Sequence, residues 1–222
     1  METSPASAVF VHGALRSGST MLRLMLGAHE GLHDPGETDF LLDHLRRTPD
    51  GWACDSEALE EDRIFRAKGI KADAGTTPLS QLMARMLPDK ALMLVCTIHR
   101  NADRLLDAFP GARVIHLLRD PRDVARSSIG MGWAGNAYHG VDHWMATERA
   151  WDSVAARLAE GQSIEVRYED LVLQPEETLD RICRFIGVPY SRAMLDYHRA
   201  STYGEPDPRL IAHCLLYTSP SP

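Results

Sequence analysis

The chain has 222 residues, the length of one large α/β domain, with 44% hydrophobic and 25% charged residues, proportions that are ordinary for a soluble globular protein. Its formal net charge of -7 argues against a nucleic-acid-binding protein, which would normally carry a basic excess. The start of the chain shows no secretory signal, and no apolar run is long enough for a membrane span. Four widely spaced cysteines without a CxxC pair favour a reducing compartment, so we expect a cytoplasmic protein that uses no metal.

Predicted strands and helices alternate along the chain. Short apolar runs bounded by turn residues predict buried strands at residues 8–12, 92–97, 113–118 and 163–167. Helical spacing of apolar residues, with capping residues and first-turn prolines, predicts helices at residues 20–28, 38–47, 56–68, 79–87, 102–108, 120–129, 141–159 and 175–186. This alternation is typical of crossover units, so we expect one α/β domain whose parallel sheet is flanked by helices.

A candidate phosphate-binding loop lies between the first strand and the first helix. Residues 13–20, Gly-Ala-Leu-Arg-Ser-Gly-Ser-Thr, have the spacing G-x-x-x-x-G-x-[ST], in which backbone N–H groups and the helix N-terminus form a cradle for an anion. Nucleoside triphosphatases carry a lysine before the final Ser/Thr, and here that position is Ser19. The missing lysine argues against a triphosphate, and Arg16 offers a replacement charge. An ordinary glycine-rich turn is the alternative.

A second candidate anion site follows the third predicted strand. Arg119 leaves the carboxyl end of that strand, where open α/β sheets bind ligands, and its planar guanidinium suits a phosphate dianion. Ser127, on the helix that follows, can add a hydroxyl donor. The alternative is that residues 119–123 are only a solvated, capped helix start.

Three blocks of the sequence resemble sulfotransferases that use 3′-phosphoadenosine-5′-phosphosulfate (PAPS). Residues 15–20 are similar to the family's 5′-phosphosulfate loop, with Leu15 where a proline is common, and residues 117–128 are similar to its 3′-phosphate motif. Residues 166–175, with the helix that ends at 185–189, resemble the third block. The resemblance implies a P-loop-type α/β fold and PAPS as co-substrate, with Tyr168 near the adenine and the phosphates bound by Arg16, Ser17, Gly18, Ser19, Thr20, Arg119 and Ser127.

The candidate general base also comes from this resemblance. Residues 34–39, Asp-Pro-Gly-Glu-Thr-Asp, are similar to the segment of the tyrosylprotein sulfotransferase branch that carries the catalytic glutamate, which makes Glu37 the candidate. The alternative is that Glu37 only favours the dipole of the helix that begins here. Histidine is the usual physiological base, and the histidines that could replace Glu37 are His12, His29 and His33.

One departure from that branch concerns a lysine that supports the transferring sulfuryl group. At the corresponding place this chain has residues 97–101, Thr-Ile-His-Arg-Asn, and no lysine. The resemblance therefore implies that His99 or Arg100 supplies the charge.

The end of the chain departs from the family. Residues 214–222 resemble one reading frame of a sequencing adapter, so we expect a non-native tail after a domain of residues 1–213 that is truncated at its C-terminus; a Ser/Pro-rich disordered tail is the alternative. The patterns predict transfer of a sulfuryl group to an acceptor hydroxyl, although this truncated chain could be inactive. A P-loop kinase or NTPase and a non-catalytic nucleotide-binding fragment stay as alternatives. The acceptor (peptide tyrosine, sugar, lipid or small phenol) and the oligomeric state are left open.

Overall fold

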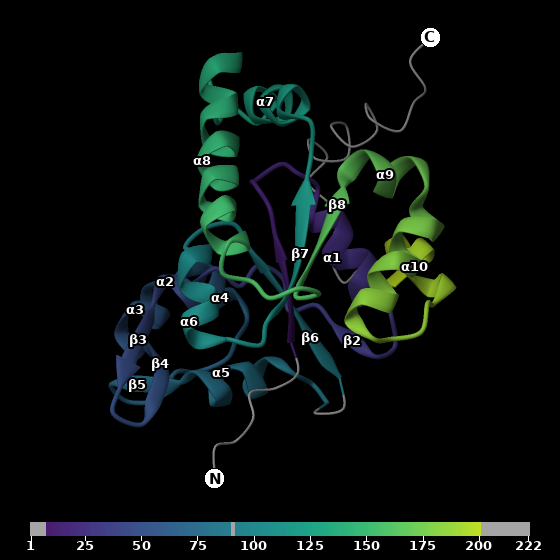
Figure 1. The fold of residues 1–222 in the computed structure, drawn as a ribbon. Helices are drawn as coiled ribbons and strands as arrows, with labels where there is room; N and C mark the ends of the chain where they lie inside the picture. Colours follow the sequence, from purple (N-terminus) through teal and green to yellow (C-terminus); the bar gives the residue numbers. More distant parts are fainter. Residues whose placement is uncertain (1–7, 90–91, 201–222) are drawn as a thin grey trace.

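The main sheet is parallel, as the alternation of elements predicts. A computed structural model describes residues 8–89 and 92–200, and the predicted tail at 214–222 lies outside them. Five strands pair in the order β2-β6-β1-β7-β8, and every neighbouring pair is parallel (Figure 1). The strands are β1 (Ala8–His12), β2 (Leu32–His33), β6 (Met93–Ile98), β7 (Arg113–Leu118) and β8 (Ser163–Arg167).

The central strand β1 is buried on both faces, because successive side chains of a strand point to opposite sides of the sheet. Val9 and Val11 belong to one hydrophobic cluster and Phe10 to another. Helices of the Val9 face are α1 (Ser19–Gly27), α9 (Tyr168–Leu173), α10 (Pro175–Ile186), η2 (Arg192–Asp196) and α11 (Tyr197–Ala200). Helices of the Phe10 face are α2 (Phe40–Asp43), α3 (Ser56–Glu61), α4 (Arg63–Ala67), α5 (Leu79–Met86), η1 (Ala102–Arg104), α6 (Leu105–Ala108) and α8 (Ala137–Ala155).

Helix α7 (Pro121–Gly130) follows β7 and packs against α8 beyond the carboxyl ends of the strands (Figure 1). Asp120 caps it, because its side chain accepts a hydrogen bond from the backbone N of Arg122, and Pro121 occupies the first turn. Within the described part of the chain, the helices are too short or too polar for any of them to cross a membrane.

Residues 45–78 differ from the sequence-based prediction. The helix predicted at 38–47 is only the single turn α2, and the chain then forms an antiparallel sheet that was not predicted. Its strands pair in the order β3-β4-β5, and they are β3 (Leu45–Thr48), β4 (Gly51–Asp55) and β5 (Thr76–Pro78).

The helix predicted at 56–68 is broken in two at Asp62. The Asp62 carboxylate accepts hydrogen bonds from the backbone N atoms of Ile64 and Phe65, at 2.8 and 3.0 Å, so it caps α4 and cannot continue α3. Asp62 itself has extended backbone angles, as N-cap residues do.

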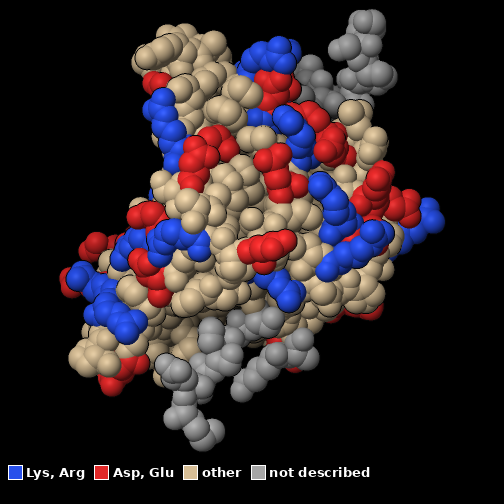
Figure 2. All heavy atoms as spheres, viewed as in Figure 1, with Lys and Arg blue, Asp and Glu red and all other residues tan. Residues whose placement is uncertain are grey.

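Charge is distributed without a single dominant sign on the visible surface. On the face in Figure 2, the described Lys and Arg side chains are interspersed with Asp and Glu. Together with the net charge of -7, this means that attraction for an anionic ligand has to come from a few individual cations near its site.

A buried aromatic stack lies between β1, β7 and α8. His12 of β1 is opposite His116 of β7 in the strand register, and the rings of His116 and Trp151 stack with centroids 4.3 Å apart. Glu148 of α8 is 2.9 Å from His116 Nε2. Burial, with smaller contributions from the nearby His116 and His99, lowers the pKa of His12 to about 4. The folded protein therefore holds His12 neutral.

We predict that His12 makes the fold sensitive to mild acid. Between about pH 6.5 and 4 the unfolded chain binds a proton that the folded chain excludes, so stability falls as pH falls. Urea unfolding should show a loss of about 2 kcal/mol between about pH 7.5 and 5 from this group. His12→Phe should remove that part of the loss, whereas His139→Gln at an exposed position should not. An unchanged pH dependence in His12→Phe would show that His12 is not responsible.

Candidate functional site

The predicted phosphate loop turns sharply between β1 and α1. Arg16 and Gly18 have φ values of 73° and 93°, and Ser17 N donates to Ala14 O at 3.1 Å. No side chain caps the first turn of α1 at Gly18. The fully buried Ser17 hydroxyl has no hydrogen-bond partner among the described residues. The loop thus offers the kind of donors that bind an anion: backbone N–H groups at a helix start and an unsatisfied hydroxyl.

Two glycines allow other elements to touch this loop. A Cβ atom on Gly13 would lie 2.5 Å from the carbonyl oxygen of Leu117 in β7. A Cβ atom on Gly18 would lie 2.3 Å from Cδ2 of Tyr168, the first residue of α9. Both distances are well inside van der Waals contact, so the loop can sit here only because these positions lack a side chain.

Arg119 fixes the loop from the next strand. It follows β7 directly, is 6% exposed, and its Nη1 donates to the carbonyl oxygen of Arg16 at 2.9 Å. Its guanidinium carbon lies 4.1 Å from the centroid of the Tyr168 ring. A cation stacked on an aromatic face at this distance is favourable, more so when it is desolvated. The structure therefore brings together Arg16, Arg119 and Tyr168, which the sequence motifs predicted as one site.

Ser127, on α7, contacts the same loop. Arg16 Nε donates to Ser127 Oγ at 2.9 Å, although the two residues are 111 positions apart in the chain. The guanidinium of Arg16 also lies 5.4 Å from the ring centroid of Trp133. Trp133 was not predicted, and a tryptophan between two helices carries no sequence signal for this contact.

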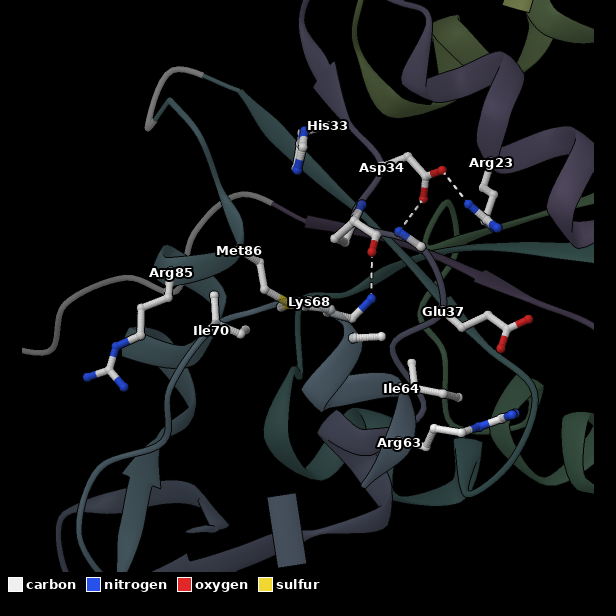
Figure 3. Close-up of a pocket in the computed structure, with 13 residues that line it drawn as sticks. Arg23, His33, Asp34, Glu37, Arg63, Ile64, Lys68, Ile70, Arg85 and Met86 are labelled. Atoms are coloured by element: carbon white, nitrogen blue, oxygen red, sulfur yellow. Dashed lines mark hydrogen bonds and ion pairs between the residues drawn. The ribbon is translucent and has the colours of Figure 1, made fainter. Parts of the chain in front are cut away.

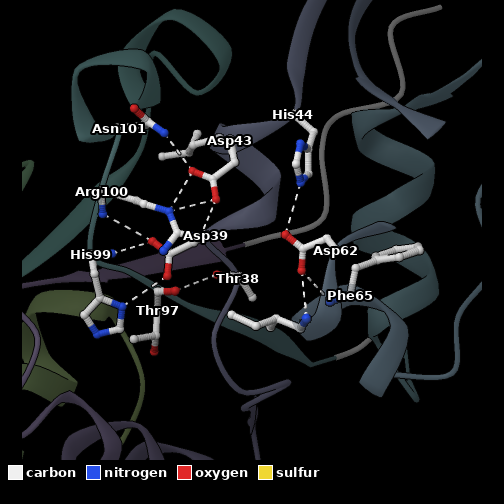
Figure 4. Close-up of polar contacts among 12 residues, drawn as sticks. Thr38, Asp39, Asp43, His44, Asp62, Phe65, Thr97, His99, Arg100 and Asn101 are labelled. Atoms are coloured by element: carbon white, nitrogen blue, oxygen red, sulfur yellow. Dashed lines mark hydrogen bonds and ion pairs between the residues drawn. The ribbon is translucent and has the colours of Figure 1, made fainter. Parts of the chain in front are cut away.

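His99 lies on the other side of the loop, after β6. Its Nε2 is 2.9 Å from Oγ of Ser19, the first residue of α1 (Figure 4 shows its surroundings). Its Nδ1 is 3.2 Å from Asp39 Oδ2, and its backbone N donates to Asp39 Oδ1 at 2.7 Å. Of the two residues predicted to supply a charge, His99 is therefore the one that reaches the phosphate loop.

The side chain of Arg100, the other candidate, is engaged elsewhere. Its Nε and Nη2 both donate to the Asp43 carboxylate, at 2.9 and 2.5 Å to Oδ2 (Figure 4). Asn101 donates to the same carboxylate at 2.7 Å. The charge of Arg100 is thus matched by an ion pair on α2.

Glu37, the candidate base, is held at the edge of the main sheet. It forms a parallel bridge with Thr97 of β6, and the neighbouring Thr38 N donates to Thr97 O at 2.9 Å. The half-buried Glu37 side chain lines a cavity of about 680 Å³ (Figure 3). Other walls of this cavity come from α1, α4 and α5, through Arg23, Arg63, Ile64, Lys68, Arg85 and Met86.

Lys68 brings a cation to the wall of this cavity. Its Nζ donates to the carbonyl oxygen of Pro35 at 2.5 Å, and burial lowers the pKa of its ammonium, although the charges of Asp34 and Glu37 act in the opposite direction (Figure 3). Asp34 in turn pairs with Arg23 at 2.7 Å in a buried ion pair. No sequence pattern predicts that Lys68, the residue that follows α4, lies beside Glu37.

The three histidines that could replace Glu37 as base lie in different environments. His33 lines the cavity, and burial lowers its pKa, so its ring favours the neutral, proton-accepting form. His29 is buried with Nε2 2.8 Å from the carbonyl oxygen of Pro189, and His12 is stacked in the interior. Within residues 8–89 and 92–200 no cluster of three or more His, Cys, Asp or Glu residues could hold a metal ion.

These features define a class of protein. A parallel α/β sheet carries a phosphate loop after its central strand, and an arginine at the end of the next strand braces that loop. This is the architecture of P-loop-type phosphate-binding proteins. Within this class the chain belongs to the sulfotransferase family, because the family model described as "Sulfotransferase family" matches residues 8–192.

Curated relatives agree with the predicted branch. A provisional protein-tyrosine sulfotransferase of Caenorhabditis briggsae is 31% identical over 202 residues, which are 86% of this chain and 69% of that protein. Protein-tyrosine sulfotransferase A of Caenorhabditis elegans is 26% identical over 210 residues, 89% of this chain and 53% of that protein. An uncharacterised Aquifex aeolicus protein is 28% identical, and the match covers 27% of it. The chain thus spans between 27% and 69% of these relatives.

Solved structures confirm the predicted fold. The sulfotransferase domain of the Synechococcus PCC 7002 olefin synthase has a TM-score of 0.67 at 24% identity, covering 96% of this chain and 85% of that one. The sulfotransferase domain from the curacin biosynthetic pathway has a TM-score of 0.67 at 22% identity, covering 91% of this chain and 81% of that one. At these identities the likeness establishes the shared fold.

We predict that Gly18→Ala destabilises the protein by about 1–3 kcal/mol, because a Cβ atom is strained at this φ and would displace Tyr168 from Arg119. Thermal unfolding measures the effect. Gly111→Ala is the matched control, since a Cβ atom there meets nothing within 4 Å. Equal melting temperatures for the two variants would contradict the tight contact between the loop and Tyr168.

Proposed function

We propose that the chain transfers the sulfuryl group of PAPS to an acceptor hydroxyl. The observation that carries the proposal is a phosphate loop that lacks the lysine but contains Arg16, which contacts both Arg119 and Ser127. A triphosphate site would keep the lysine. Membership of the sulfotransferase family supports the reaction class.

The residues around the loop fit the proposed co-substrate. Ser17, Ser19, Thr20 and the backbone N–H groups beside them would hold the 5′-phosphosulfate, and the buried unsatisfied hydroxyl of Ser17 favours a ligand oxygen there. Arg119 and Ser127 would hold the 3′-phosphate, since both belong to the matching motif and both approach Arg16.

Tyr168 would lie near the adenine, with one restriction set by its neighbours. The guanidinium of Arg119 already covers one face of the Tyr168 ring. An adenine ring near Tyr168 would therefore not stack on the face that Arg119 covers.

PAPS supplies an activated sulfuryl group on its 5′-phosphate. In the proposed reaction the acceptor oxygen bonds to sulfur, the acceptor proton moves to Glu37, and the bridging oxygen keeps the electron pair of the broken S–O bond. Glu37 is suited to the proton because it lines the cavity and has no ion-pair partner within 4 Å among the described residues. His99 would support the charge that develops beside the phosphate loop, since its ring contacts Ser19.

A P-loop kinase or NTPase is the weaker alternative. Such an enzyme needs an acidic side chain beside the loop to hold magnesium. Asp120, the acidic residue after β7, instead caps α7 and pairs with Arg122. Its lowered pKa, about 2, has the hydrogen bonds from Arg122 as its largest cause.

We predict selective binding of the product nucleotide, 3′-phosphoadenosine-5′-phosphate (PAP), over ATP, without a requirement for magnesium. Arg119→Ala should weaken PAP binding about ten-fold or more, since charge-assisted hydrogen bonds are worth about 1.5–3 kcal/mol. Arg122→Ala is the matched control, because its side chain is 88% exposed and pairs with Asp120. Titration calorimetry measures both, and equal affinity for ATP and PAP would refute the proposed co-substrate.

We predict that Glu37→Gln keeps PAP affinity but lowers turnover of PAPS by about 10²-fold or more, because the amide preserves shape and cannot take the proton. Turnover is measured on a panel containing a tyrosine peptide, a simple phenol, a sugar and a hydroxylated lipid. Glu30→Gln, at an exposed position after α1, serves as the control. Activity within a few-fold of wild type in Glu37→Gln would transfer the role of base to His33, which lines the same cavity.

A further inference from the structure

A chain of hydrogen bonds links three separate elements at the phosphate loop. It runs from Ser19 Oγ on α1 to His99 Nε2 after β6, at 2.9 Å, and from His99 Nδ1 to Asp39 Oδ2 at the start of α2, at 3.2 Å. The three residues are 6%, 7% and 1% exposed. Ser19 occupies the position at which nucleoside triphosphatases carry the loop lysine, so this chain of bonds ends where that charge would be.

The side chain of Asp39 does not cap the helix at whose N-terminus it lies. Asp39 is the N-cap residue of α2, yet its side chain makes no capping bond to that helix. Its Oδ1 accepts instead from the backbone N atoms of His99 and Arg100, at 2.7 and 3.2 Å. An aspartate that leaves its own helix uncapped and makes three contacts with the segment after β6 fixes the position of His99.

The same contacts set which nitrogen of His99 carries a proton. Burial raises the pKa of Asp39, but hydrogen bonds from the ring and backbone of His99 and the charge of Arg100 outweigh this, so the pKa is lowered overall. An ionised carboxylate only accepts hydrogen bonds, so His99 Nδ1 must carry a proton.

The hydrogen bond between His99 Nε2 and Ser19 Oγ can therefore run in either direction. With a neutral His99 ring, Nε2 accepts a hydrogen bond from the Ser19 hydroxyl. Ser19 then offers a ligand in the loop only its lone pairs, which cannot donate to an anion. With a protonated ring, Nε2 donates to Ser19 Oγ, and the Ser19 hydroxyl can donate to a ligand. An anion in the loop favours the second arrangement, because it gains a donor and a nearby positive charge.

We propose that Asp39 is a positioning residue that holds His99 against Ser19, so that anion binding in the phosphate loop is coupled to the uptake of a proton by His99. Ser19 and His99 together then replace the loop lysine. This inference rests on the proposed function, in which the anion is the 5′-phosphosulfate. When the S–O bond breaks, its electron pair stays on the bridging oxygen of the 5′-phosphate, and the imidazolium balances that added charge through Ser19.

The other charged groups around His99 leave this coupling intact. Arg100, next in the chain, has its guanidinium paired with Asp43 of α2. His12 of β1 also acts on His99 electrostatically, but with a pKa of about 4, caused mainly by burial, it is neutral near pH 7. Asp39 is thus the ionised partner that contacts the ring directly.

Calorimetry of PAP binding tests the coupling. Titrations at about pH 8, where the phosphates of PAP are ionised, in buffers of different ionisation enthalpy count the protons taken up. Wild type should take up a proton, and His99→Gln should not. Asp39→Asn should lower proton uptake and weaken binding about ten-fold or more. His99→Lys should bind PAP without uptake, since it restores a fixed charge. Equal proton uptake by wild type and His99→Gln would overturn the coupling.

A matched control and a second measurement distinguish the positioning of His99 by Asp39 from the binding of PAP. Asp43→Asn, on the same short helix, removes the ion pair with Arg100 but no contact of His99, so proton uptake and PAP affinity should match wild type. In ¹⁵N-histidine-labelled protein without nucleotide, the His99 ring should show a protonated Nδ1 that is lost in Asp39→Asn. An unprotonated Nδ1 in wild type would refute the role of Asp39. Failure of wild type to bind PAP would instead remove the proposed function and the coupling with it, while the NMR result still decides what Asp39 does.

Discussion

The phosphate loop packs tightly against β7 on one side and Tyr168 on the other, and the rest of the site depends on this constraint. Gly13 lies against the backbone of β7 and Gly18 against the ring of Tyr168, so the loop cannot shift toward either side. Arg119 closes the arrangement because it donates to the loop carbonyl of Arg16 and also covers Tyr168. A phosphate cradle built from backbone atoms needs this kind of support, since backbone donors cannot be repositioned by changing a rotamer.

Two arginines, one in the loop and one outside it, supply positive charge at the phosphate loop. In a chain with a net charge of -7 and no loop lysine, the cations near the cradle are Arg16 of the loop itself and Arg119 after the next strand. Arginine suits this arrangement, because one guanidinium can donate to protein and ligand oxygens at once and remains charged when it is buried. His99 approaches from the strand on the other side of β1, so both neighbours of the central strand contribute to the site.

The parts of the fold that could be predicted are those in which local pattern and tertiary environment agree. The strands at 8–12, 113–118 and 163–167 and the helix at 175–186 have the predicted bounds, because buried apolar runs and a capped, amphipathic helix leave little ambiguity. The antiparallel sheet was missed because Leu45 to Thr48 reads equally well as the end of a helix, and only its pairing with β4 decides. Sequence motifs predicted Arg16, Arg119, Ser127 and His99 as site residues, and the structure brings all four to the phosphate loop. They could not find Asp39 as the partner of His99, or Lys68 beside Glu37, because those contacts join segments that the pattern does not relate.

The small antiparallel sheet has a consequence for how the cavity beside Glu37 can change. The chain enters this sheet after α2 and returns to the parallel sheet at β6, so the segment between them forms a sheet separate from the parallel one. Its helices α4 and α5 supply one wall of the cavity, whereas α1 and the segment around Glu37 supply the other. Substitutions in this segment can therefore change the shape and charge of the cavity while the strands that carry the phosphate cradle stay as they are. Under the proposed function, residues 45–78 and the helices among them would set acceptor choice, whereas the strands and the phosphate loop would keep the sulfuryl chemistry.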